Sequence, residues 1–61
     1  MIRYLLIYKG YPKMAFHVNE LMEATEMFKA YRKLSGDVDL IEISWYPEVK
    51  QMMTKRVPVE A

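Results

Sequence analysis

The sequence contains no cysteine and a single histidine, His17. Disulfide bonds and thiolate metal sites are therefore excluded, and so is a histidine-rich metal site. Asp37 and Asp39 have a spacing that metal-binding loops use, but two carboxylates are too few for an oxygen site, and the pair fits a turn. We therefore expect no metal and no other cofactor. The lack of cysteine also fits a cytoplasmic protein.

An excess of charge of one sign and a long apolar run are also missing. Nine basic and eight acidic residues give a net charge of +1, a balance that is typical of neither a nucleic-acid binder nor an acidic DNA mimic. No apolar run approaches the ~18 residues of a membrane span, so we expect no membrane partner. Only two glycines and three prolines are present, and 52% of the residues are hydrophobic, which favours a folded core over disorder.

The length of 61 residues predicts one domain. A chain this short buries only about 60% of the surface that it exposes when unfolded. Such small domains usually depend on disulfides, a metal or oligomerisation. Because the composition excludes the first two, oligomerisation or complex formation remains.

The first strand is expected at 2–9, where five consecutive residues are apolar or aromatic. Successive side chains of a strand point to opposite faces of the sheet. A half-buried strand would alternate apolar with polar residues, whereas this one is apolar on both faces. We therefore predict that it is the central strand of a small sheet. One face carries Leu5 and Ile7, and the other carries Tyr4, Leu6 and Tyr8.

A second strand is expected at 14–18, after a turn at Gly10, so that the first two strands form a hairpin. A helix is predicted at 20–34, with Asn19 as its N-cap and Gly36 as a left-handed cap at its C-terminal end. Apolar residues of this helix repeat with the 3.6-residue period and form one stripe: Leu21, Ala24, Met27, Phe28, Tyr31 and Leu34.

A third strand is expected at 38–46, and one of its faces is wholly apolar whereas the other is mixed. The helix is expected to pack on the apolar face. The predicted core between helix and sheet is Leu5, Ile7, Phe28, Tyr31, Ile41, Ile43 and Trp45.

The C-terminal part is expected to hold a short helix at 47–53, with Pro47 at its first position. A flexible tail is expected at 54–61. The fold class is therefore a single α+β domain spanning 1–53, in the order strand, strand, helix, strand. A right-handed crossover places the third strand beside the first, which gives an antiparallel or mixed, three-stranded sheet of order 2-1-3 with one helix on one face.

Residues for catalysis are few. A general base at His17 would need a nucleophile or a proton donor nearby, and the two serines, Ser35 and Ser44, fall in a helix cap and a strand. No glycine-rich phosphate loop is present. The small tautomerases use an N-terminal proline as a base, but here Ile2 follows Met1. We therefore expect no catalytic residue and no enzymatic activity.

The second sheet face has no predicted helix to cover it, and an apolar patch of that kind is uncommon on a monomer. We predict that it is the interface of a two-fold homodimer, formed by Tyr4, Leu6, Tyr8, Leu40 and Tyr46. A secondary contact is predicted on the outer side of the helix, at Met22, Lys29 and Lys33.

These features favour a small, non-enzymatic protein that binds a larger protein as an inhibitor or adaptor. The strand–strand–helix–strand layout is similar to that of small phage proteins that inhibit host enzymes, among them inhibitors of uracil-DNA glycosylase. That resemblance implies a phage-encoded inhibitor of a host protein. The alternative is a nucleic-acid-binding module with an aromatic and basic sheet surface, made of Tyr4, Tyr8, Tyr11 and Tyr46 with Arg3, Lys9 and Lys13.

Overall fold

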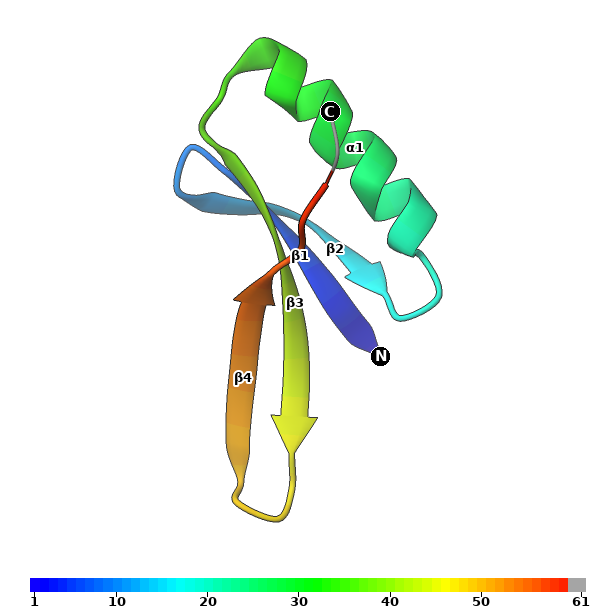
Figure 1. Cartoon of the computed structure of the whole chain (residues 1–61), viewed down its shortest axis with the longest axis vertical. Helices are drawn as coiled ribbons and strands as arrows, with labels where there is room; N and C mark the ends of the chain where they lie inside the picture. Colours follow the sequence, from blue (N-terminus) through cyan, green and yellow to red (C-terminus); the bar gives the residue numbers. More distant parts are fainter. Residues whose placement is uncertain (60–61) are drawn as a thin grey trace.

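A computed structural model describes residues 1–59 as a four-stranded sheet with one helix packed on one of its faces (Figure 1). The elements are β1 (Ile2–Tyr8), β2 (Tyr11–His17), α1 (Leu21–Leu34), β3 (Val38–Tyr46) and β4 (Gln51–Arg56). The strand order is β2-β1-β3-β4, and all neighbouring strands are antiparallel. The α+β class and the central place of β1 are confirmed. The predicted count of three strands is wrong, because β4 adds a fourth.

The β1–β2 hairpin closes through a two-residue turn, since Tyr8 pairs with Tyr11. Its central residues, Lys9 and Gly10, have positive φ angles of 51° and 83°. Positive φ at both positions is the geometry of a type I′ turn, whose twist matches the twist of the flanking strands. Glycine adopts this conformation without steric cost, as the sequence predicted for Gly10.

Helix α1 forms over the predicted range, but both of its ends differ from prediction. Glu20 rather than Asn19 is the N-cap residue, and its side chain makes no capping hydrogen bond. Instead, the Glu20 carboxylate accepts a hydrogen bond of 2.6 Å from the backbone N–H of His17 and so closes the turn between β2 and α1. Ser35 is extended and donates its backbone N–H to Tyr31, which ends the helix before Gly36 is reached. Gly36 therefore needs no left-handed conformation and has none.

Helix α1 packs on the opposite sheet face from the predicted one. Leu6 and Leu40 are fully buried beneath it. The whole core is Tyr4, Leu6, Phe16, Ala24, Phe28, Val38 and Leu40. Of the predicted core, only Phe28 is buried. Tyr31 and the four aliphatic residues are half-buried, and Trp45 is exposed.

The length of β3 explains this reversal. Helix α1 contacts β1, β2 and β3, but within residues 1–59 it makes no contact with β4. The polar residues Glu42 and Ser44, which made this face of β3 look mixed, lie beyond the part of the strand that is buried. Only Val38 and Leu40 had to be apolar for the helix to pack there.

Strand β4 replaces the predicted helix at 47–53. A four-residue turn at 47–50 joins β3 to β4, because Tyr46 pairs with Gln51. The backbone N–H of Lys50 donates to the carbonyl of Pro47 at 3.3 Å, and Lys50 has a positive φ of 53°. Four-residue hairpin loops are commonly built around such a turn.

The segment predicted as a tail also takes part in the fold. Its first three residues complete β4, and the backbone N–H of Val57 donates to the carbonyl of Leu40 at 2.8 Å. Val57 and Val59 pack against the core. Figure 1 shows this segment returning from β4 toward α1. The last two residues of the predicted tail, 60–61, lie outside the described residues.

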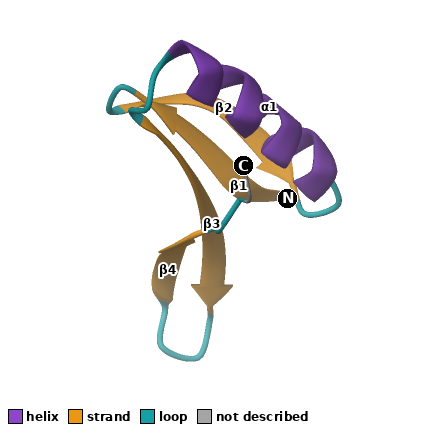
Figure 2. Ribbon diagram, turned by 45° about the horizontal axis from the view of Figure 1, so that its top comes forward, coloured by secondary structure: helices purple, strands orange, loops and turns teal. Residues whose placement is uncertain are grey.

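The β3–β4 hairpin projects beyond the rest of the sheet (Figures 1 and 2). Pairing of β1 with β3 stops at Tyr4 and Glu42, so the following residues of β3 pair only with β4. We call residues 43–54 the arm. The arm makes the molecule elongated, with principal extents of 39 × 23 × 18 Å.

Candidate interaction surface

The sheet face away from α1, here called the open face, has no helix over it within residues 1–59 (Figure 2). Antiparallel partners point to the same side of a sheet, so the strand register fixes which residues share this face. Most of these strand-paired residues are apolar, and only two of them are charged. They are Leu5, Ile7, Pro12, Ala15, Asp39, Ile41, Ile43, Trp45, Met52, Thr54 and Arg56.

Exposure on the open face increases toward the arm. Leu5 and Ile41 are half-buried by their neighbours in the sheet. Trp45 and Met52, which are direct cross-strand partners, are 57% and 61% exposed. They line a groove of about 500 Å³ with Met1, Ile2, Arg3, Ile43 and Pro47. The arm therefore presents a large aromatic ring and a flexible thioether side by side in solvent.

The two charged residues of the open face neutralise each other. Arg56 Nε lies 3.2 Å from Asp39 Oδ1. An exposed ion pair of this kind contributes little to stability. Its consequence for binding is that the strand-paired residues of the open face carry no net charge. Arg3, which borders the groove, is paired with Glu42 instead.

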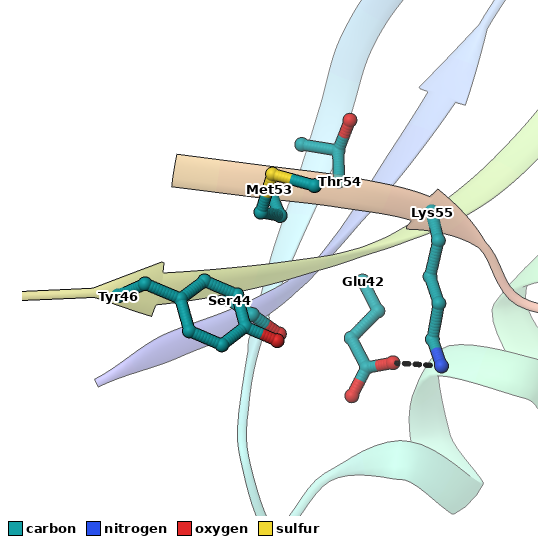
Figure 3. Close-up of a pocket in the computed structure, with 6 residues that line it drawn as sticks. All are labelled: Glu42, Ser44, Tyr46, Met53, Thr54 and Lys55. Carbon is teal, nitrogen blue, oxygen red and sulfur yellow. Dashed lines mark ion pairs between the residues drawn. The ribbon is translucent and has the colours of Figure 1, made fainter. Parts of the chain in front are cut away.

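The side of the arm toward α1 holds a shallow polar depression of about 240 Å³ (Figure 3). It is lined by Glu42, Ser44, Tyr46, Met53, Thr54 and Lys55. The Glu42 carboxylate lies 3.7 Å from Lys55 Nζ and 3.6 Å from an Arg3 guanidinium nitrogen. Because Glu42 is shared by cations from β1 and β4, it links three strands at the base of the arm. No histidine lines this depression, so Ser44 has no imidazole base beside it.

The His17 side chain lies beside the N-terminal residue, with its Nδ1 3.1 Å from the amine of Met1. Asp37 and Asp39 do not converge. The backbone N–H of Asp37 donates to Ser35 Oγ at 3.2 Å, whereas Asp39 pairs with Arg56. Within residues 1–59, no three side chains of the metal-binding types are grouped.

All five residues predicted to form a dimer interface lie on the sheet face toward α1. Tyr4, Leu6 and Leu40 are buried in the core. Tyr8 is half-buried, and its ring lies 4.9 Å from that of Tyr31. Only Tyr46, on the arm, is largely exposed. The assignment of this face to a partner is corrected: α1 covers it within one chain, and the opposite face is left open.

The predicted secondary contact is on the surface of α1. Met22 is 79% exposed, and Lys29 and Lys33 are exposed as well. Met22 borders a shallow apolar depression with Met27. Charged residues, Glu23 and Glu26, complete its lining.

The aromatic and basic surface of the nucleic-acid alternative is not assembled on one face. Tyr4 is in the core, and Tyr8 packs on Tyr31. Arg3 is paired with Glu42. Tyr11 is exposed, but it lies at the β1–β2 turn.

Sequence reasoning missed the residues that are most exposed on the open face. The alternation in 38–46 did identify Ile43 and Trp45 as one apolar face. Met52 was not placed with them because its cross-strand pairing with Trp45 is not a local pattern.

No protein-family model, curated protein or solved structure shows significant similarity to this chain. Across the part of the chain that the structure describes, no helix has both the length and the apolar character needed to cross a membrane.

Proposed function

We propose that this chain is a small non-enzymatic protein that acts by binding other protein chains, and that it serves as an inhibitor or adaptor of a larger protein. The observation that supports this proposal is the open face with its arm, where Trp45 and Met52 are exposed to solvent beside the half-buried Ile43. Monomeric proteins rarely expose contiguous apolar patches of this kind without a binding role.

The arm gives a second reason. A two-stranded ribbon is at best marginally stable in water without a surface to pack on. In this chain both sides of the arm are exposed, since Tyr46 and Met53 lie on the side opposite Trp45 and Met52. A partner that covers either side would bury apolar area and hold the ribbon in place.

The residue types on the open face suit protein recognition. Binding interfaces are enriched in aromatic residues and methionine at their centre, and charged residues are depleted there. Trp45 and Met52 fit this composition. The ion pair of this face, Asp39–Arg56, lies at the end of β3 and β4 that is distant from the turn of the arm.

Binding to nucleic acid is the weaker proposal. It needs an assembled surface of aromatic and basic side chains, whereas Tyr4 is buried in the core and Arg3 is paired with Glu42. An oligonucleotide complex that dissociates with rising salt would favour it.

Capture from a cell lysate on the immobilised chain tests the proposal. The cytoplasm is the proposed setting, because a chain without cysteine is indifferent to its reducing conditions. We expect the natural chain to retain a specific larger protein, and Trp45→Arg to retain less of it by about 30-fold. Leu34→Arg is the matched control, because Leu34 is also exposed but lies on α1. Equal recovery by all three chains, or no recovery by any, would contradict the proposal.

A further inference from the structure

We propose that the occupant of the open face is a second copy of this chain, in a two-fold dimer that packs the two open faces together. The arm of each copy would lie over Leu5, Ile7 and Ile41 of the other, a set that we call the shelf. The inference rests on the proposed function only in taking the open face as a binding surface, for which the second copy and the larger protein would compete. It adds the identity of the partner and the arrangement.

The amount of exposed surface supports a dimer. A compact monomer of 7.3 kDa exposes about 4,200 Å² of accessible surface. This chain exposes 4785 Å², which is about 600 Å² more than that relation gives. In a standard interface each partner contributes about 800 Å². The surplus surface of one chain is therefore close to what one subunit of a dimer buries.

The charge of the open face supports a second copy rather than an unlike partner. In a two-fold interface the same patch meets itself, so a patch with a net charge would repel its own copy. The open face carries one acid and one base, Asp39 and Arg56, and these are paired at 3.2 Å. Its other strand-paired residues are uncharged, and Arg3, which borders the groove, is paired with Glu42. Self-pairing therefore brings no unpaired charge of these residues together.

The arrangement of apolar residues explains how the two copies fit. The arm, with Trp45 and Met52, lies at one end of the open face, and the shelf lies at the other. A two-fold axis that passes between them, near Ile43 and Thr54, places each arm on the shelf of the other copy. Both ends of the open face are then covered at once, and neither end is left to bind a third copy.

Pairing through the strand edges is disfavoured by contrast. The outer edge of β4 carries Lys55 and Arg56, and Lys50 stands at its start. Lysine on an edge strand opposes the addition of further strands. Two such edges side by side would bring Lys50 and Lys55 of both copies together, whereas neither lysine belongs to the open face.

Sedimentation equilibrium tests the dimer. We expect the natural chain to have the mass of a dimer at tens of micromolar, and Trp45→Arg and Met52→Lys to raise the dissociation constant by about 30-fold or more. Both positions are exposed in one chain, so circular dichroism should be unchanged. Leu34→Arg should leave the dimer intact. A natural chain that stays monomeric at millimolar concentration, or that grows beyond a dimer, would overturn the proposal.

Cross-linking tests the position of the axis, and it does not depend on any variant that removes apolar contacts. The chain has no cysteine, so Thr54→Cys provides one thiol on the open face. We expect a disulfide-linked dimer under mild oxidation, and far less of it for Lys29→Cys on the outer side of α1. Equal yields would contradict the two-fold arrangement.

The two proposals fail separately. A monomer that still captures a larger protein would overturn only the dimer, and a dimer that captures nothing would overturn only the inhibitor or adaptor role.

Discussion

Leu5 and Leu6 are neighbours in the sequence, yet they lie in different environments. Leu6 is fully buried between the sheet and α1. Leu5 points to the open face, where its cross-strand partners are Ala15 and Ile41. The same side chain therefore contributes to the core at one position and to a surface at the next. This pair of residues reports directly which face α1 covers.

Leu6→Ala should lower the free energy of unfolding by about 2–5 kcal/mol, because it removes a buried side chain and leaves a cavity. Leu5→Ala should cost clearly less, since its side chain is only half-buried. Urea denaturation followed by circular dichroism measures both. A Met52→Lys background removes self-association from the comparison. A loss at Leu5 as large as that at Leu6 would mean that the face assignment is wrong.

Sequence periodicity separated the two side-chain sets of each strand but did not decide which set is the core. Both sets of β1 are apolar, so this strand is uninformative. The choice made from β3 failed because Glu42 and Ser44 were counted against a face on which only Val38 and Leu40 are buried. How far a helix extends along a strand is a property of the tertiary structure.

Among the elements, β4 shows why a local pattern can mislead. Val49, Met52 and Met53 have helical spacing, and Pro47 precedes them as it would at the start of a helix. This segment forms a strand because its residues pair with those of β3 across the turn. Met52 pairs with Trp45, and Lys55 pairs with Glu42. Such cross-strand pairs stabilise a sheet, and they depend on a register that the segment alone does not specify.

The C-terminal segment after β4 should stabilise the fold. Val57 and Val59 are half-buried against the core, and Val57 is hydrogen-bonded to Leu40. The double variant Val57→Ala, Val59→Ala should lower the free energy of unfolding by about 2 kcal/mol, because two valine side chains lose part of their burial. Val49→Ala is the control, since Val49 is exposed in the turn of the arm. Thermal unfolding with no difference between the two would show that the segment does not contribute.

At the scale of the whole molecule, one helix covers one sheet face, and the other face continues onto a projecting arm (Figure 2). A domain of 61 residues has little stability to spare. Burial of the open face by a second copy would therefore add to stability as well as to specificity. Oligomerisation, which length and composition predicted, remains a proposal. The proposed interface is now the open face instead of the face that α1 covers.

Methyl relaxation by a soluble gadolinium chelate is the most direct test that the open face is an association surface. The natural chain and Trp45→Arg are compared at the same high concentration. We predict that the methyl groups of Ile43 and Met52 are shielded in the natural chain and strongly relaxed in the variant. Leu6 should be shielded in both, and Leu34 relaxed in both. Ile43 and Met52 methyl groups that are relaxed equally in the two chains, or a Leu6 methyl group that is relaxed in either, would contradict the account.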